Sequence, residues 1–336
     1  MRQYQLQKSG NGYQPTLAEV STPAPQAGEV LVRVRATSLN YRDHMLGPLG
    51  GIGDKGIGTV PLSDGAGEIE AVGEGVTRFR VGDRVAGSFF QSWKNGRFAM
   101  DYHDSALGGA VNGMLSEYVV LHENGLVKIP DYLSYEEAAT LPCAAVTVWQ
   151  GLFARGGLQP GETVLALGTG GVSIFALQFA IAHGAKVIVT SSSDEKLEQA
   201  RKLGAWQTIN YKKIPDWDKE VWQLTEKRGV DHVIEVGGAD TYERSLKTVA
   251  AGGQIVQIGV LSGLEMRPNL FPLQVRNANI SGIYVGSREH FEQLNQFLVE
   301  KAIHPVIDQV FPFEQANAAY EHLAKGAHFG KVVITV

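Results

Sequence analysis

Cysteine is nearly absent from this chain, which has one, Cys143, among 336 residues. A disulfide framework is therefore excluded, and so is a zinc site built from several cysteines. The sequence has no run of about 18 apolar residues and no apolar segment near its start, so we expect a cytoplasmic protein without a membrane span. The net charge of −5 offers no basic surface, so we expect no nucleic-acid partner.

The composition is otherwise ordinary. The chain is long enough for two domains, each with its own core. Hydrophobic residues make up 44% and charged residues 19%, as is typical of a soluble globular enzyme. The 40 glycines indicate many tight turns and a β-rich portion.

A strand, a glycine turn, a helix and a second strand follow one another in the middle of the chain. Residues 163–167 form an apolar run, as a buried parallel strand would, and residues 186–190 form another. Gly168, Gly170 and Gly171 interrupt the pattern between them. We predict a right-handed crossover unit whose turn binds the diphosphate of a dinucleotide at the start of the helix.

The turn matches the G-x-G-x-x-G fingerprint in part. Gly168 and Gly170 occupy the first two places, whereas the third is Ser173. Val172 opens the predicted helix and is, with the glycines, a candidate cofactor contact. The strand before the turn and the helix after it favour a dinucleotide site. A structural turn without a ligand is the alternative.

The N-terminal part is predicted to be rich in short strands. Residues 30–36 alternate apolar and polar side chains, and residues 64–76, 81–86 and 118–121 continue in the same style with glycine turns. This pattern favours a barrel-like fold. Residues 89–113 are aromatic with little periodicity, so we predict a long ordered loop. Its aromatics could line a substrate pocket or an interface, or belong to the core.

Strands and helices alternate in the rest of the chain. The pattern predicts a doubly wound parallel sheet of six strands, the last two at residues 254–260 and 280–285. Residues 306–336 return to strand, helix, strand. The predicted capping boxes pair Ser134 with Glu137 and Ser192 with Glu195.

The order of these pieces resembles the medium-chain dehydrogenase/reductase superfamily over essentially the whole chain. The resemblance rests on residues 36–46, 64–85, 141–152 and 328–336, together with the glycine turn. It implies an α/β protein with a GroES-like, β-barrel-type catalytic domain and a Rossmann domain with a doubly wound parallel sheet. The nicotinamide is then expected between the two domains.

The resemblance also implies the limits of the domains. We expect the GroES-like catalytic domain at residues 1–127 and the Rossmann domain at residues 128–286. Residues 287–336 are expected to return to the catalytic domain.

Zinc alcohol dehydrogenases of this superfamily need three protein ligands for a catalytic metal. The corresponding positions hold Asn40, Ser63 with Asp64 beside it, and Cys143. Asparagine and serine are poor zinc ligands, so the chain resembles the zinc-free quinone oxidoreductase branch and is expected to hold no metal. Cys143 is expected to be a small apolar helix residue.

The end of the second Rossmann strand indicates which dinucleotide binds. An NAD-preferring domain usually has a carboxylate there, whereas this chain has Ser191 and Ser192. Lys196 follows in the next helix, and the resemblance places Tyr211 and Lys331 at the cofactor. Together they favour NADPH. Alternatively, the lysines are ordinary solvated residues and Tyr211 packs at a strand end.

Candidate catalytic residues follow from the zinc-free assignment. Without a Lewis acid, hydride transfer suits acceptors that are already electrophilic, and the protein supplies orientation and hydrogen bonds. Asn40 is the first candidate to hold the nicotinamide ribose or to polarise a substrate oxygen. Tyr41 could donate a hydrogen bond or a proton. Asp64 is a site candidate or a turn residue.

Four further residues complete the expected cofactor site. Thr147 is expected on a helix that faces the cofactor, with a helix-surface role as the alternative. The resemblance places Gly259, Val260 and Val285 near the nicotinamide, since ligands of open α/β sheets bind at the carboxyl ends of the strands. Turn formation and core packing are their alternative roles.

These observations predict an NADPH-dependent, zinc-free oxidoreductase that transfers hydride to a quinone or an α,β-unsaturated carbonyl. An NAD(P)-dependent alcohol dehydrogenase is the second hypothesis, and a non-catalytic dinucleotide-binding protein is the third. The resemblance implies a homodimer through the edge of the Rossmann sheet, where residues 280–285 are the expected edge strand.

Overall fold

The computed structural model describes residues 1–263, 265 and 268–336. The chain forms two compact units. Unit 1 consists of Met1–Val146 and Val285–Val336, and unit 2 consists of Thr147–Tyr284. A compact unit is not by itself a domain, so the expected limits at 127/128 and 286/287 stay a prediction. None of the described helices is long and apolar enough to cross a membrane.

Unit 1 is built on a seven-stranded sheet with the order β14-β15-β3-β4-β5-β7, in which β6 pairs with β3. Two further strands form an antiparallel hairpin. The strands of the unit are β1 (Arg2–Ser9), β2 (Gly12–Glu19), β3 (Glu29–Leu39), β4 (Asp64–Val72), β5 (Arg84–Gly87), β6 (Tyr118–His122), β7 (Leu126–Lys128), β14 (Ile307–Pro312) and β15 (Lys331–Thr335).

The pairing of β3 with its neighbours brings distant residues together. The alternating side chains Val30, Val32 and Val34 are buried in the core, as the sequence pattern predicted. At the other end of β3, Ser38 is opposite Asp64 of β4, and Leu39 is opposite Val332 of β15. The start of β4 and the start of β15 therefore meet at the end of β3.

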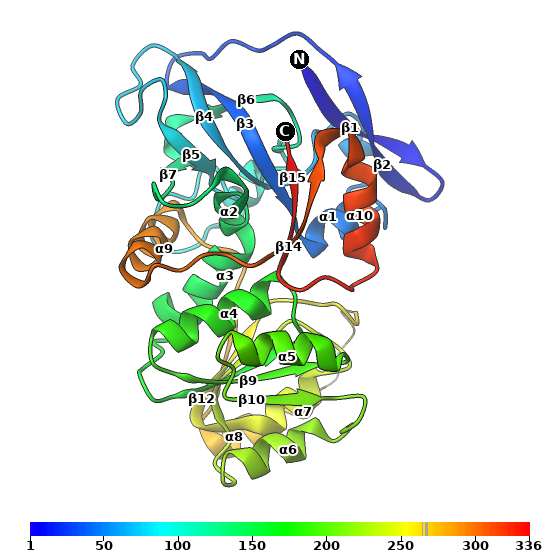
Figure 1. Cartoon of the computed structure of the whole chain (residues 1–336), viewed down its shortest axis with the longest axis vertical. Coiled ribbons are helices and arrows are strands. Elements are labelled where there is room, and N and C mark those ends of the chain that lie inside the picture. The colour runs from blue at the N-terminus through cyan, green and yellow to red at the C-terminus, as the bar shows by residue number, and fades with distance from the viewer. Residues whose placement is uncertain (264, 266–267) are drawn as a thin grey trace. The chain divides into compact units, whose positions relative to one another are not determined.

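The helices of unit 1 flank this sheet. The C-terminal helix α10 lies beside α1 (Figure 1). The capping box of Ser134 and Glu137 at α2 is confirmed. The helices of unit 1 are α1 (Tyr41–Leu46), α2 (Tyr135–Ala138), α9 (Arg288–Lys301) and α10 (Ala316–Ala324), with a π-helical segment at Leu141–Ala145. The helical run continues along the chain through α3 (Val146–Val148) to a second π-helical segment, Trp149–Ala154, which belongs to unit 2.

Unit 2 contains the predicted six-stranded parallel sheet, with the order β10-β9-β8-β11-β12-β13. This is the doubly wound order of dinucleotide-binding folds, and its direction reverses between β8 and β11. The strands are β8 (Thr163–Leu167), β9 (Lys186–Ser191), β10 (Gln207–Asn210), β11 (Val230–Glu235), β12 (Val249–Gln257) and β13 (Asn279–Gly282).

In the part of unit 2 that the structure describes, five helices connect these strands, and Figure 1 shows α4 and α5 on the same face of the sheet. They are α4 (Gly171–Ala182), α5 (Asp194–Lys202), α6 (Trp217–Leu224), α7 (Tyr242–Thr248) and α8 (Phe271–Arg276). One predicted cap is wrong. Ser193, not Ser192, is the N-cap residue of α5, because the Ser193 hydroxyl accepts from the amide of Lys196.

The limits of two strands also differ from the prediction. β12 begins at Val249 rather than at residue 254, and its end at Gln257 leaves Val260 outside the sheet. β13 ends at Gly282, so Val285 is not part of an edge strand. The backbone of Val285 has φ +57°, which is incompatible with an extended strand.

Residues 89–113 form the predicted long ordered loop, with one 3₁₀ turn at Met100–Ser105. Phe89, Phe90 and Trp93 are fully buried, and Phe98 packs edge-on against Trp93. These contacts favour core packing for most of the loop's aromatic side chains.

Candidate active site

The glycine turn of unit 2 joins the buried strand β8 to α4. Gly168 has φ +77°, in the left-handed region that favours glycine, although an added Cβ would meet no atom there. Gly170 is the N-cap residue of α4, and no side chain caps the first amides of this 12-residue helix. Ser173, at the imperfect third place of the motif, donates its hydroxyl to the carbonyl of Leu167 and so holds the turn.

This turn fits the diphosphate of a dinucleotide. The first amides of α4, from Gly171 and Val172 onward, lack side-chain acceptors and lie at the positive end of the helix dipole. The turn also lies at the carboxyl end of β8, where the strand order reverses. An anion placed there would receive backbone hydrogen bonds without any charged side chain.

The predicted adenosine contacts lie close together at the ends of β9 and β10. Ser191 is paired with Asn210 in the sheet, and the amide of Tyr211 donates to the carbonyl of Ser191 at 3.1 Å. The Tyr211 side chain is 41% exposed. Ser192 follows β9 directly, and Lys196 lies in the first turn of α5.

One carboxylate near this edge is already paired. Asp194, the first residue of α5, accepts from Lys213 Nζ at 2.5 Å and from Asn210 Nδ2 at 2.8 Å. These hydrogen bonds hold the pKa of Asp194 below its usual range. Sequence reasoning missed Lys213 and Asn210, although both stand beside Tyr211 in the chain.

A buried carboxylate that sequence reasoning also missed organises the end of β11. Glu235 accepts from the amides of Gly237 and Gly238, at 2.7 and 3.1 Å, and from the hydroxyls of Thr241 and Ser245. The carbonyl of Glu235 also accepts from the amide of Gly259 at 3.1 Å. A buried strand-end glutamate before two glycines is the signal that could have revealed it.

The remaining predicted cofactor residues lie in different surroundings. Val260 lies against Gly238, whose added Cβ would come within 3.0 Å of the Val260 Cα. Thr147 is buried in the helical run of residues 141–154. Val285 belongs to unit 1, where it is buried with the positive φ described above.

A second polar group lies in unit 1, where β3, β4 and β15 meet. The ammonium of Lys331 donates to the carbonyl of Leu39 at 2.7 Å, to Asn40 Oδ1 at 2.7 Å and to Asp64 Oδ2 at 3.3 Å. The Lys331 residue is 3% exposed, and Asp64 is fully buried. Asp64 Oδ1 accepts from the hydroxyl of Ser63 at 2.9 Å. The predicted residues Asn40, Asp64 and Lys331 thus form one network.

Asn40 is also fixed through its backbone, because it caps helix α1. Its amide donates to Asp43 Oδ2 at 2.8 Å, so Asp43 completes a capping box. Burial raises the pKa of Asp43 to about 6, although the nearby Arg42 opposes the shift. Tyr41, the first residue of α1, is 38% exposed. Its ring lies 6.1 Å from that of His44, centroid to centroid.

The comparisons with known proteins identify the family of the chain. Residues 26–131 match the model of the alcohol dehydrogenase GroES-like domain, and residues 171–300 match that of zinc-binding dehydrogenase. A zinc-type alcohol dehydrogenase-like protein of Schizosaccharomyces pombe is 49% identical, over 92% of this chain and 91% of its own length. The chain belongs to the medium-chain dehydrogenase/reductase superfamily. It is an NAD(P)-dependent oxidoreductase with a GroES-like N-terminal domain and a Rossmann-type sheet, as the sequence predicted.

Other members of the superfamily are similar over the whole chain. A quinone oxidoreductase of Pseudomonas aeruginosa is 35% identical, over 96% of this chain and 93% of its own length. A crystal structure of a Sinorhizobium meliloti 1021 protein with an alcohol dehydrogenase title superposes with a TM-score of 0.94 at 42% identity. The match covers 100% of this chain and 98% of the chain in that structure. Relatives therefore carry both alcohol dehydrogenase and quinone oxidoreductase names.

The residues at the zinc-ligand positions of this superfamily do not fit a catalytic zinc ion. Asn40 Oδ1 and Asp64 Oδ2 accept from an ammonium that would repel a metal cation, and the Ser63 hydroxyl donates to Asp64. Burial, with a contribution from Asp64, raises the pKa of the Cys143 thiol. Among the described residues, no group of three His, Cys, Asp or Glu side chains could hold a metal.

Proposed function

We propose that this protein is an NADPH-dependent, zinc-free oxidoreductase that transfers hydride to a quinone or an α,β-unsaturated carbonyl. The observation that carries the proposal is the buried Lys331 ammonium, which engages Asn40 and Asp64 at the positions where relatives would bind zinc. A buried ion pair of this kind already neutralises the charge of Asp64. Such a site suits acceptors that need no Lewis acid.

The preference for NADPH is supported by the end of β9. Ser192, which is partly exposed, would offer its hydroxyl to a 2′-phosphate where a carboxylate would repel it. Ser191 beside it is buried, and its hydroxyl accepts from the amide of Ser193. The first carboxylate after β9 in the chain, Asp194, is paired with Lys213. Lys196 and Tyr211 complete the proposed adenosine site. Gly168, Gly170, Gly171 and Val172 would hold the diphosphate.

When bound, the nicotinamide supplies the hydride, and the protein's own residues orient and polarise the acceptor. Asn40 would donate a hydrogen bond to the acceptor oxygen as negative charge develops there. Tyr41, exposed at the start of α1, would donate a hydrogen bond or a proton. The carboxylate of Asp64 would remain paired with the ammonium of Lys331. Thr147, Gly259, Val260 and Val285 are proposed to border the nicotinamide.

Alcohol dehydrogenation is the second candidate, because the 49% identical relative is named a zinc-type alcohol dehydrogenase-like protein. A panel of quinones, enones and alcohols, assayed with NADP and NAD cofactors before and after chelation, separates the candidates. We expect NADPH consumption with quinones or enones that survives chelation. Alcohol oxidation that is lost on chelation and restored by zinc would favour the second candidate. Comparable affinity for NADPH and NADH would defeat the proposed preference.

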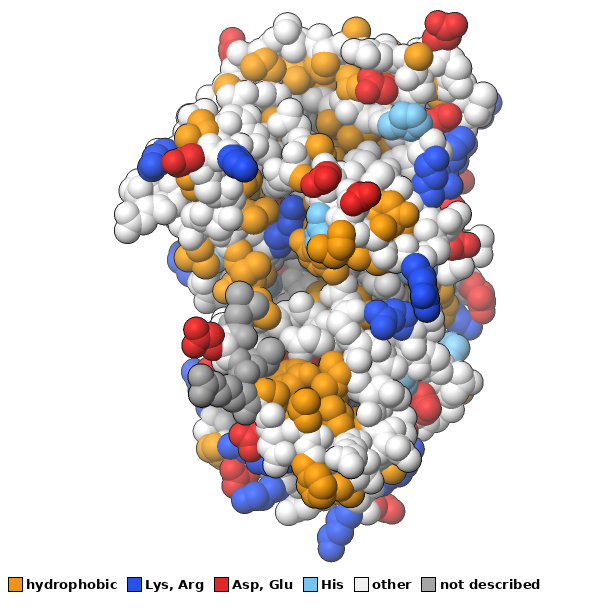
Figure 2. All heavy atoms as spheres, turned by 180° about the vertical axis from the view of Figure 1, so that it is seen from behind, with side chains coloured by type: hydrophobic (Ala, Val, Ile, Leu, Met, Phe, Trp, Pro, Cys, Tyr) orange, Lys and Arg blue, Asp and Glu red, His pale blue; other side chains and the backbone are white. Residues whose placement is uncertain are grey.

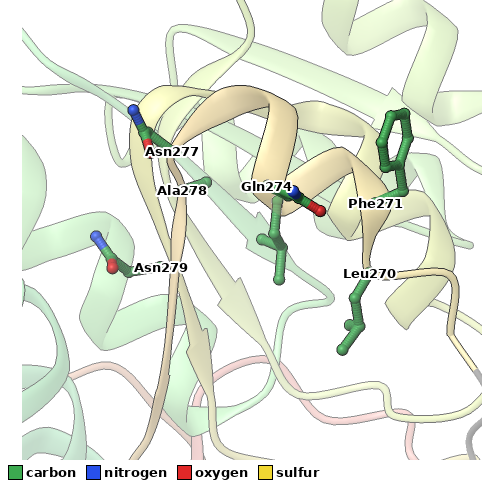
Figure 3. Close-up of a pocket in the computed structure, with 7 residues that line it drawn as sticks. Leu270, Phe271, Gln274, Asn277, Ala278 and Asn279 are labelled. Atoms are coloured by element: carbon green, nitrogen blue, oxygen red, sulfur yellow. The ribbon is translucent and has the colours of Figure 1, made fainter.

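We also infer a homodimer formed through β13, the last strand in the order of the unit 2 sheet. Figure 2 shows hydrophobic side chains gathered on the surface of unit 2. A cavity of about 540 Å³ lies at the start of β13, between Asn279 and the exposed Leu270 and Phe271 of the α8 region (Figure 3). A second copy pairing along β13 would cover these groups. Ile280→Lys should then yield monomers in sedimentation velocity, whereas a monomeric wild type would refute the dimer.

A further inference from the structure

The side-chain amide of Asn40 is held in one orientation. Its oxygen accepts from Lys331 Nζ at 2.7 Å, so the nitrogen is turned to the other side. That nitrogen, Nδ2, is buried and has no hydrogen-bond partner among the residues that the structure describes. A buried donor without a partner costs about 1–3 kcal/mol, so such a group is expected to meet a ligand. The backbone amide of Asn40, bonded to Asp43, fixes the same residue from the other end.

Lys331 itself has no hydrogen left for a ligand. An ammonium group has three donors, and those of Lys331 face the Leu39 carbonyl, Asn40 and Asp64. Lys331 is the first residue of β15, where it pairs with Ile307 of β14, and this pairing holds its backbone in place. Any influence of Lys331 on catalysis must therefore pass through the groups that it holds. This geometry disfavours the earlier expectation that Lys331 touches the cofactor.

Building on the proposed function, we propose that Lys331 is a positioning residue that turns Asn40 so that Nδ2 donates to the carbonyl oxygen of the acceptor. When hydride adds to the β-carbon of an enone, the C=C π electrons move toward the oxygen, which becomes an enolate. A hydrogen bond from Asn40 Nδ2 stabilises that charge. A proton from water then reaches the α-carbon and restores the carbonyl, so one hydride and one proton are consumed for each alkene reduced.

A double-mutant cycle tests this coupling. Asn40→Ala should lower kcat for an enone on the order of 100-fold, as the loss of one oxyanion donor does. Lys331→Met should lower kcat by about 10-fold or more, and the double variant should be no slower than Asn40→Ala, because both changes remove one function. The Kd of NADPH, measured by fluorescence, should stay within about threefold in Lys331→Met, since Lys331 does not touch the cofactor.

Three results would overturn the assignment. Losses that multiply in the double variant would mean that Lys331 acts elsewhere. A large rise in the NADPH Kd of Lys331→Met, with kcat unchanged, would make it a cofactor contact. An unchanged Lys331→Met enzyme would give it no role. Lys128→Met is the matched control, because Lys128 pairs with Asp83 in the same unit at an exposed position. Its kcat should equal that of the wild type.

A readout independent of turnover separates this inference from the proposed function. In ¹⁵N-labelled protein, the side-chain NH₂ signals of Asn40, identified by their loss in Asn40→Ala, should shift and broaden in Lys331→Met. Unchanged signals would refute the positioning role. A wild type that reduces neither quinones nor enones would refute the proposed function, and these signals would still decide whether Lys331 fixes Asn40. If Lys331→Met fails to fold, Lys331→Met/Asp64→Asn removes both charges and replaces it in each experiment.

Discussion

The two candidate sites of this chain are built in opposite ways. The turn at Gly168 in unit 2 uses backbone amides and a left-handed glycine, and no side chain caps the first amides of α4. The network at Lys331 in unit 1 uses buried side chains that satisfy one another, except at Asn40 Nδ2. The first site can receive an anion with almost no rearrangement of side chains. The second is internally neutral and can offer an acceptor one directed hydrogen bond.

The largest difference between the two sites should appear when one member of the Lys331 network is removed. Asp64→Ala leaves a buried ammonium without its counter-charge, which should destabilise unit 1 by about 3–5 kcal/mol. Urea unfolding of the variant measures this loss. Asp64→Leu/Lys331→Met, in which neither charge remains, should recover much of it. A loss below about 1 kcal/mol would mean that the pair is solvated, as surface ion pairs are.

The pH dependence of stability should report on Asp43, whose carboxylate accepts from the backbone amide of Asn40. Burial raises the pKa of Asp43 to about 6, from 3.8 in an unperturbed carboxyl. Its contribution to stability is therefore complete below pH 3.8 and is lost as the pH rises to about 6, since the unfolded chain releases the proton first. The loss is on the order of 3 kcal/mol. Asp43→Asn should abolish this part of the slope in urea unfolding between pH 4 and 7.

An exposed aspartate of the same unit is the control for Asp43. Hydrogen bonds from Tyr13 and Lys8 lower the pKa of Asp54, so its contribution has the opposite sign and grows with pH. Asp54→Asn should leave the falling limb between pH 4 and 6 in place. The assignment to Asp43 is wrong if that limb persists in Asp43→Asn.

Two glycines at opposite ends of β8 sharpen the argument for the cofactor turn. Gly168 and Gly161 both have positive φ, +77° and +87°, and in both an added Cβ would meet open space. Alanine should therefore cost about 1–2 kcal/mol of stability at either position. Gly168→Ala alone should also weaken NADPH binding by about 10-fold, because the turn would relax away from the diphosphate. Equal NADPH affinities in the two variants, by fluorescence titration, would argue against this turn as the diphosphate site.

The smallest expected effect distinguishes two neighbouring serines. Ser193→Ala removes the N-cap hydrogen bond of α5 and should cost about 1 kcal/mol in thermal or urea unfolding. Ser192→Ala should change stability by less than about 0.5 kcal/mol, since this serine does not cap the helix. If Ser192→Ala were the more destabilising of the two changes, Ser192 would be the N-cap residue, as the sequence pattern predicted.

The Rossmann part of the chain was largely predictable because its signals are local. Apolar runs and the glycines at 168, 170 and 171 predict the strands, the turn and α4 from neighbours in sequence. The predicted cap was wrong by one residue, because the two neighbouring serines both fit a capping pattern. Glu195 follows Ser192 by three residues, whereas Ser193 accepts from the amide of Lys196, three residues further on. The strand limit at Gly282 was missed because nothing in a valine predicts the left-handed backbone at Val285.

The Lys331 network could not be predicted in the same way. Its members stand at residues 39, 40, 64 and 331, and only the pairing of β3 with β4 and β15 brings them together. The sequence therefore identified Asn40 and Asp64 as candidates through the missing zinc ligands, and Lys331 as a candidate for a different role. Glu235 was missed although its partners follow within ten residues, because the sequence pattern was interpreted only as a buried strand and a glycine turn.

Zinc content measured together with activity tests the central claim most directly. Purified protein should be assayed for NADPH-dependent reduction of a quinone and an enone, with the metal content of the same samples measured by mass spectrometry. The account predicts full activity in samples with far less than one zinc per chain, and no gain when zinc is added. Activity that rises in proportion to bound zinc would contradict it.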